Sequence, residues 1–181
     1  MVTTARHLKS DPLANAIAMI GDDDDLRAVL LEMRQLTGMK FAAIAFVSEE
    51  RWIASQIDDG LEFGLAPGDE LDVQMTICKQ VRAGAYEIFI DDVARDLNWS
   101  CHPVPRKYGF RSYLSIPILV GSAFFGTLCA IDPNPRVQPL ADIRDKLLVM
   151  AGKTGHLLME RMRQDLSAHS TSHLSNLKYQ H

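Results

Sequence analysis

The chain has 181 residues, of which 47% are hydrophobic and 23% are charged, as in an ordinary globular domain. Its formal net charge of −4 offers no basic surface to hold a nucleic-acid backbone, so we expect no nucleic-acid partner. Its three cysteines lack Cys-x-x-Cys spacing, which argues against a disulfide framework and a cysteine-based zinc site, and we expect no metal.

Residues 1–21 predict an N-terminal extension that contains one short helix. They lack the apolar core of a signal peptide, and the longest apolar runs elsewhere are too short to cross a bilayer. We therefore expect a cytoplasmic protein with no membrane partner. The helix is expected from Asp11 to Ile20, with Asp11 as its cap and Pro12 at its first position.

Four consecutive acidic residues, 22–25, precede the next helix. Consecutive residues fan out around a helix and do not converge on one cation, so we interpret them as a cap and a favourable charge at the positive end of the helix. The helix ends at Gly38, and its apolar face has five members at helical spacing: Leu26, Val29, Leu30, Met33 and Leu36.

The middle of the chain predicts antiparallel strands. The compact apolar run at 40–47 predicts a buried strand, and the alternation at 51–57 after a Ser-Glu-Glu turn predicts its hairpin partner. The loop at 58–70 is rich in Gly, Asp and Pro. Three of its apolar side chains are expected to fold back over the domain: Leu61, Phe63 and Leu65.

The second half repeats this alternation of helix and strand. A short helix is expected at 73–83 and a strand at 86–90. A long connection with a helical turn or two, at 91–108, leads to a hairpin at 111–131. A long helix is expected at 139–166, before a polar tail.

This order of elements predicts an α+β fold. One central antiparallel sheet would carry the N-terminal and C-terminal helices on one face and the crossover segments on the other. The domain is expected at 22–166 and the polar tail at 167–181. Gly152 and Gly155, inside the long helix, are expected to allow the close approach of another helix.

Four motifs resemble those of GAF domains, especially the N-terminal sensory modules of bacterial histidine kinases and related signalling proteins. They read T-I-C, F-I-D-D-V-A-R-D, Y-G-F-R-S-Y-L-S-I-P-I and F-F-G-T-L-C-A-I-D, and the resemblance covers residues 22–162. It implies a GAF/PAS-like fold whose crossover segments roof a ligand pocket, and homodimerisation through the terminal helices. It implies a regulatory protein of two-component signalling, not an enzyme, with a kinase or another output domain as partner.

The tail has no kinase motif of its own. His169 lacks the sequence context of a phosphoacceptor histidine. His169 and His173 stand four apart, but with no third ligand we interpret them as part of a solvated tail. The chain is expected to be a free-standing sensor or the input module of a larger signalling protein.

Strand alternation assigns the side chains of the last hairpin to two faces. The more apolar set, with Leu114, Ile116 and Leu128, is expected under the helices. The mixed set suits a binding pocket, although a second, ligand-free core is the alternative. The pocket-side set is Tyr113, Ser115, Thr127 and Cys129.

The crossover supplies further candidates for ligand contact. The Asp91-Asp92 pair could accept hydrogen bonds from a ligand or satisfy backbone groups in a turn, and Trp99 could stack on a ligand or anchor the lid. The set that we name as ligand-binding from this segment is Asp91, Trp99, Cys101, His102, Tyr108 and Phe110. No cofactor is required, and the ligand is unidentified.

The positions of the three cysteines indicate two alternative functions. Cys101-His102 is placed like the pair that attaches and contacts the tetrapyrrole in bilin-binding GAF photoreceptors, although Pro103 and Pro105 disfavour the regular helix that carries that pair. Free methionine-(R)-sulfoxide reductases, also GAF folds, use pocket cysteines, and here Cys78, Cys101 and Cys129 could approach one pocket. This chain lacks that family's G-H-I-A-C-D-like segment.

Overall fold

The computed structural model describes residues 11–177 of the chain. A six-stranded antiparallel sheet lies at its centre, with the strands in the order β3-β2-β1-β6-β5-β4. The strands are β1 (Phe41–Val47), β2 (Trp52–Asp59), β3 (Glu70–Leu71), β4 (Ile88–Ile90), β5 (Ser112–Val120) and β6 (Ala123–Asp132). The fold is α+β, as predicted, and β3 is an edge strand that the sequence analysis did not identify.

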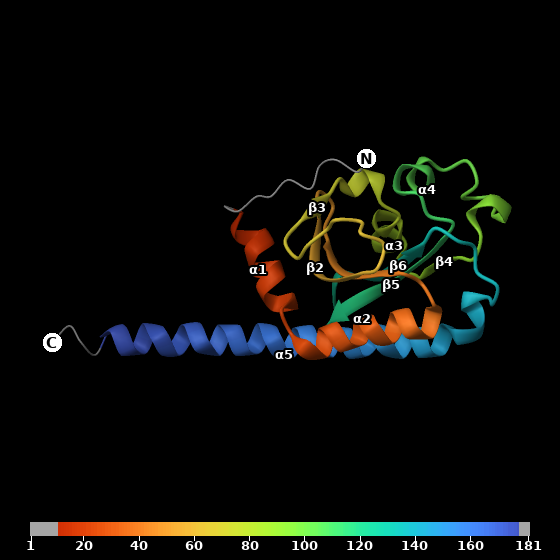
Figure 1. Cartoon of the computed structure of the whole chain (residues 1–181). Coiled ribbons are helices and arrows are strands. Elements are labelled where there is room, and N and C mark those ends of the chain that lie inside the picture. Colours follow the sequence, from red (N-terminus) through yellow and green to blue (C-terminus); the bar gives the residue numbers. More distant parts are fainter. Residues whose placement is uncertain (1–10, 178–181) are drawn as a thin grey trace.

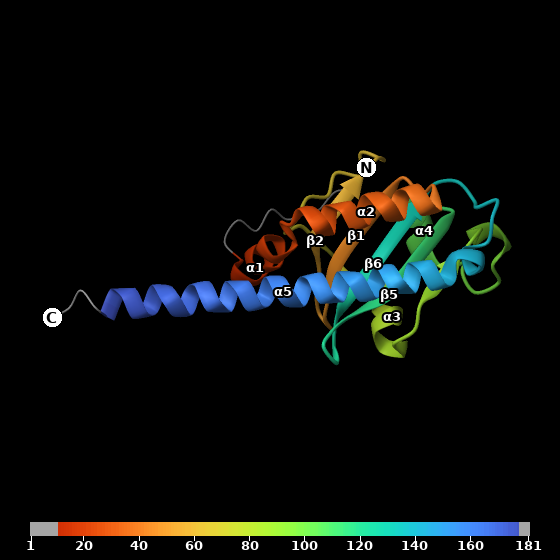
Figure 2. The same ribbon diagram turned by 90° about the horizontal axis from the view of Figure 1, so that it is seen from below.

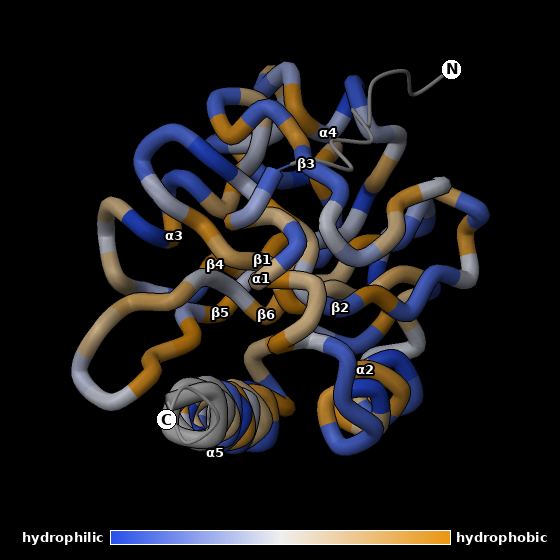
Figure 3. The backbone as a smooth tube through the Cα atoms, turned by 90° about the vertical axis from the view of Figure 1, so that its left-hand side faces the viewer, coloured by the Kyte–Doolittle hydropathy of each residue, from blue (hydrophilic) through white to orange (hydrophobic). Residues whose placement is uncertain are grey.

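Three helices cover one face of the sheet: α1 (Pro12–Gly21), α2 (Asp24–Thr37) and α5 (Arg144–Leu177). Figure 3 shows α2 and α5 side by side on this face, and Figure 2 shows that the C-terminal part of α5 extends beyond the sheet. A hydrophobic core lies between these helices and the sheet. It contains Leu114, Ile116 and Leu128, the residues predicted for this face.

The opposite face is covered by shorter segments (Figure 1). They are the loop at 60–69, the 3-10 turns η1 (Val73–Met75) and η2 (Val93–Arg95), and the short helices α3 (Cys78–Gly84) and α4 (Pro103–Tyr108). A second hydrophobic core lies beneath them and includes Tyr113 and Cys129. The two-sided assignment of the hairpin is therefore confirmed.

The N-terminal helices begin at the predicted caps. The carboxylate of Asp11 accepts hydrogen bonds from the backbone N–H groups of Leu13 and Ala14, and Pro12 is the first residue of α1. Asp23 caps α2 in the same way. Asp22 and Asp24 pair with Arg27, so the acidic run at 22–25 serves the start of α2.

The helical parts of the second half differ in extent from the prediction. The segment expected as one helix at 73–83 is η1 followed by α3, because the Thr76 hydroxyl donates to the carbonyl of Val73 and closes the first turn. The expected strand at 86–90 is reduced to Ile88–Ile90. The long helix begins with a 3-10 turn, η3 (Leu140–Ile143), and α5 continues into the segment expected as a tail. The side chains of His169 and His173 lie outside the described part.

Gly155 allows a close approach to the sheet, not to another helix. A Cβ atom there would lie 2.1 Å from the carbonyl oxygen of Leu119 on β5, whereas a Cβ at Gly152 would meet nothing within 4 Å. Within residues 11–177, none of the helices has the length and apolarity to cross a membrane.

Candidate functional site

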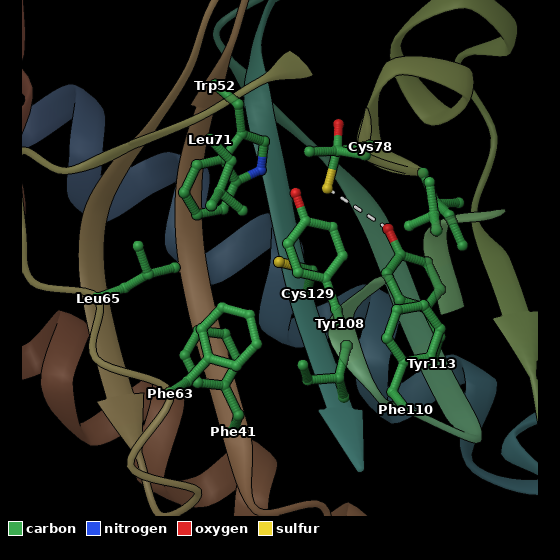
Figure 4. A pocket seen from close by; sticks show the side chains of 14 residues that line it. Phe41, Trp52, Phe63, Leu65, Leu71, Cys78, Tyr108, Phe110, Tyr113 and Cys129 are labelled. Carbon is green, nitrogen blue, oxygen red and sulfur yellow. Dashed lines mark hydrogen bonds between the residues drawn. The ribbon is translucent and has the colours of Figure 1, made fainter. Parts of the chain in front are cut away.

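A cavity of about 50 Å³ lies between the sheet and the segments that cover its second face (Figure 4). Its wall is mostly apolar and aromatic. The lining residues are Phe41, Trp52, Phe63, Leu65, Leu71, Thr76, Ile77, Cys78, Val104, Tyr108, Phe110, Tyr113, Cys129 and Ile131. Ligand pockets for drug-sized molecules measure about 300–1,000 Å³, so a ligand of that size would enter only if the covering segments moved.

One end of the cavity is aromatic and is closed by side chains that do not come from the sheet. The ring of Phe63, from the loop at 60–69, lies 5.3 Å from Phe41 on β1 and 5.8 Å from Tyr108 on α4, between ring centroids. Phe63 and Tyr108 are only half-buried. The covering side of the aromatic end therefore consists of a loop and a short helix, which can move without breaking the sheet.

The covering loop is held by a carboxylate at the end of β2 and by an unusual backbone conformation at Glu62. Asp59 accepts hydrogen bonds from the N–H groups of Leu61 (2.9 Å) and Gly64 (3.0 Å). Glu62 has a φ of 54°, a left-handed conformation that is uncommon outside glycine. This compact turn places Phe63 and Leu65 on the cavity, as expected from the apolar pattern of the loop.

The other end of the cavity contains two thiols. The sulfur of Cys78, the first residue of α3, lies 3.4 Å from the phenolic oxygen of Tyr113 and accepts from the hydroxyl of Ser115 at 3.8 Å. The Cys129 thiol donates to the backbone carbonyl of Ala43 at 3.6 Å. All of these side chains are buried. The polar chemistry of the pocket is therefore concentrated around Cys78.

The surroundings of Cys78 favour its thiolate. Hydrogen bonding from Cys129 lowers the pKa of Cys78, with further contributions from Thr127, Tyr113 and Trp52, and burial opposes them. The pKa of the Cys129 thiol is raised, first by hydrogen bonding with Cys78 and then by burial. Burial also raises the pKa of Tyr113 well above its usual value, so Tyr113 remains a hydrogen-bond donor.

Two buried hydrogen-bond donors near the thiols have no acceptor in the described part of the chain. The Trp52 indole N–H and the Thr127 hydroxyl make no hydrogen bond of ordinary length within the described part of the chain, yet both lie close enough to Cys78 to lower its pKa. Trp52 is 3% exposed and Thr127 is fully buried. A buried donor without a partner is costly, so both groups would gain from an acceptor that entered this end of the cavity.

Asp91 and Asp92 lie outside the cavity wall. The Asp91 carboxylate accepts a hydrogen bond from the N–H of Leu140 at 2.8 Å, at the beginning of η3. Asp92 caps η2, and its two carboxylate oxygens accept hydrogen bonds from the Arg111 guanidinium at 2.7 and 2.8 Å. The Arg111 guanidinium lowers the pKa of Asp92. Both carboxylates satisfy groups of the protein itself, which is one of the two roles left open for the pair.

The Cys101-His102 pair also lies away from the cavity wall. Cys101 is exposed, and His102 caps α4 by accepting a hydrogen bond from the N–H of Val104 at 3.3 Å. Trp99 packs its ring edge-on against His102, 5.0 Å between centroids. Pro103 and Pro105, which were expected to disfavour a regular helix here, lie in the first turn of the short helix α4, where backbone N–H groups need no helical partner.

The structure therefore brings together part of the candidate set. Tyr108, Phe110, Tyr113 and Cys129 line the cavity, and Ser115 and Thr127 lie buried beside Cys78. The lining residues that sequence reasoning missed are scattered over several elements: Phe41, Trp52, Leu71, Thr76, Ile77, Val104 and Ile131. A signal for one of them existed, because alternation along β1 puts Phe41 on the same face as Ala43, which pairs with Cys129.

Comparison with known proteins places this geometry in one family. A family model described as GAF domain matches residues 23–152. No curated protein matches the chain. Among solved structures, the photoproduct state of GAF3 from Slr1393 of Synechocystis sp. PCC6803 superposes with a TM-score of 0.59 and 20% identity. That match covers 80% of this chain and 96% of the other.

Two further solved structures show the same fold. A domain described as part of a two-component sensor histidine kinase protein from Sinorhizobium meliloti 1021 has a TM-score of 0.57 and 15% identity, over 82% of this chain and 97% of the other. A type II free methionine-R-sulfoxide reductase from Thermoplasma acidophilum has a TM-score of 0.58 and 10% identity, over 82% and 96%. At these identities the likeness concerns the fold.

Proposed function

The chain belongs to the GAF domain family, and on that premise we propose that it is a non-enzymatic sensory domain of bacterial signal transduction. Its pocket would bind a small, largely apolar molecule on the second face of the sheet. The domain would report this binding through α5 to a kinase or another output domain. The neighbours of known structure include sensory domains, which supports the signalling role but not the choice of ligand.

The composition of the cavity wall is the observation that carries this proposal. An apolar wall with its polar groups gathered at one end is typical of a small-molecule site, because the apolar part supplies affinity and the polar part fixes orientation. The sheet provides the rigid floor, while Phe63 and Tyr108 stand on segments that can move. A ligand that displaced them would enlarge the cavity without disturbing the six-stranded sheet.

Contacts between β4 and the start of α5 offer a route for the signal. Asp91, directly after β4, accepts from the N–H of Leu140, and its carbonyl accepts from the N–H of Arg136 at 2.8 Å. Glu87, directly before β4, forms an ion pair with Arg144, the first residue of α5. A ligand that favours one position of the crossover would therefore shift the population of α5 positions.

The test is whether a ligand raises the melting temperature of the unmodified chain, and whether a variant with a filled pocket loses this effect. Small apolar and aromatic compounds would be screened against the full chain, since a ligand at about 100 times its Kd stabilises the folded state by about 2.7 kcal/mol. Leu65→Trp fills the cavity from the covering loop and is expected to abolish the shift in melting temperature. The matched control is Leu97→Trp, at a position that is 97% exposed, where the shift should persist. An equal shift in both variants would contradict the pocket assignment.

We further propose that the domain forms a homodimer through α2 and α5. Leu31 on α2 is 51% exposed and Val149 on α5 is 72% exposed, and a second copy of this surface would cover both. Val149→Glu is expected to yield monomers in light scattering after size-exclusion chromatography. Val137→Glu, in a loop and 99% exposed, is the control that should leave the oligomeric state unchanged. Monomers of the unmodified chain at high concentration would contradict the dimer.

The bilin alternative has little support from this geometry. Cys101 is exposed and does not line the cavity, and a cavity of about 50 Å³ is far smaller than a tetrapyrrole. Thiol chemistry has more support, since Cys78 and Cys129 share one end of the cavity.

A further inference from the structure

We propose that Cys78 and Cys129 form a redox-sensitive dithiol in the pocket, and that small hydroperoxides convert it to a disulfide. This inference deepens the proposed sensory function and rests on it, because it assigns the pocket a chemical class of signal. Cys78 would be the attacking thiol, and Cys129 would be the thiol that resolves the first oxidation product.

The donors around Cys78 make it the attacking thiol. Tyr113 and Ser115 reach its sulfur at 3.4 and 3.8 Å. Trp52 and Thr127 add two buried donors that have no other partner in the described part of the chain. A sulfur anion would accept from Tyr113 and Ser115, and the thiolate is the form of cysteine that reacts with peroxides.

The position of Cys129 suits the resolving role. It lines the same cavity from β6, and Figure 4 shows both sulfur atoms on the cavity side of their backbones. Its thiol donates to the Ala43 carbonyl at 3.6 Å, and Cys129 is the neighbour that most lowers the pKa of Cys78. Cys129 is therefore held as a thiol beside Cys78, where its sulfur can attack an oxidised partner.

The two steps balance as follows. The Cys78 thiolate attacks one peroxide oxygen, the O–O bond breaks, and the leaving alkoxide takes a proton and departs as an alcohol, so that Cys78 becomes a sulfenic acid. The Cys129 sulfur then attacks the Cys78 sulfur, the S–O bond of the sulfenic acid breaks, and the hydroxide leaves with the Cys129 thiol proton as water. Together, two thiols and one hydroperoxide give one disulfide, one alcohol and one water.

The disulfide would change the pocket and its cover together. It would connect α3 to β6 across the sulfur end of the cavity and remove the thiol and thiolate from it. The donors of Tyr113 and Ser115 would lose their anionic acceptor. Oxidation and ligand binding would therefore exclude each other at this end of the pocket.

The test uses the full reduced chain with Cys101→Ser, which removes the exposed thiol. After exposure to methyl hydroperoxide, peptide mapping is expected to show Cys78 linked to Cys129, with the loss of two hydrogen atoms from the intact mass. Cys129→Ser in this background should stop at the sulfenic acid of Cys78, which dimedone traps. Thr127→Val, which removes one donor, should raise the pKa of Cys78, so that at a pH below that pKa oxidation slows by up to about tenfold for each unit of the rise.

The outcomes are distinct from those of the ligand test. The proposal is overturned if both buried thiols remain free after peroxide treatment while circular dichroism shows a folded protein. It is also overturned if free methionine sulfoxide and a thiol reductant give continuous turnover, since the pair would then belong to a reductase. If Cys78→Ser still binds an apolar ligand that Leu65→Trp does not, the sensory pocket stands whatever the fate of the dithiol.

Discussion

The sulfur of Cys78 on α3 lies 3.4 Å from the phenolic oxygen of Tyr113 on β5. This contact connects a covering helix of the pocket to the sheet, and it points a protonated donor at the thiol whose pKa is lowered. The pocket therefore contains a nucleophile that is buried and supported by the fold, unlike the exposed thiol of Cys101.

Tyr113→Phe is expected to raise the pKa of Cys78, because it removes one donor to the thiolate and leaves the ring in place. The loss of one hydrogen bond should also cost about 1 kcal/mol of the free energy of unfolding. Thiolate ultraviolet absorbance followed against pH, in the Cys101→Ser background, measures the first effect. An unchanged titration would show that Tyr113 does not stabilise the anion.

Thr127→Val is expected to change the free energy of unfolding by no more than about 0.5 kcal/mol, since the Thr127 hydroxyl has no hydrogen bond to lose. The matched control is Thr154→Val in α5, where an equally buried hydroxyl donates to the Met150 carbonyl at 2.8 Å and its loss should cost about 1 kcal/mol. Urea unfolding measures both. Thr127→Leu would be a poorer probe, because overpacking there costs about 1–3 kcal/mol.

The two glycines of α5 are expected to respond in opposite directions to alanine. Gly152→Ala should stabilise the protein by up to about 1 kcal/mol, because the added methyl meets nothing and alanine favours the helix. Gly155→Ala should destabilise it, because its Cβ would clash with the Leu119 carbonyl and force α5 away from β5. Thermal unfolding gives the sign of each change, and destabilisation by both would refute the open space at Gly152.

Asp91→Ala is expected to loosen the start of α5, with a loss of about 1 kcal/mol of stability, because the N–H of Leu140 loses its acceptor. Asp91→Asn keeps an acceptor oxygen and serves as the matched control. Hydrogen exchange at Leu140 measures the local effect. Equal protection in both variants would remove this contact from the proposed signalling route.

Stability is expected to fall in acid through carboxylates with lowered pKa values. The pKa of Asp11 is lowered, first by the N–H of Ala14 and then by Arg51, and that of Asp92 is lowered first by Arg111. The folded state thus binds fewer protons than the unfolded state, so this stability is present above about pH 4 and is lost as the pH falls through the folded values. Arg111→Gln should flatten the change in urea midpoint between about pH 5 and pH 3, whereas Arg163→Gln, on the exposed surface, should not.

Local chemistry accounts for most of what the sequence predicted correctly. The Asp11 and Asp23 caps act on N–H groups two or three residues away, so their roles are visible in the sequence. Alternation with a period of two divided the last hairpin into its two faces, because strand geometry fixes that division. The apolar pattern of the loop likewise indicated that Phe63 and Leu65 fold inwards.

The composition of the pocket was decided by tertiary structure. Trp52, Cys78 and Cys129 are far apart in the chain, and they meet because β1 pairs with both β2 and β6 and α3 packs over the sheet. No local pattern contains that information, since it depends on strand order and register. The sequence by itself determined the elements, their caps and the two faces of the sheet. The packing of distant segments decided which thiols share a cavity and left Cys101 outside it.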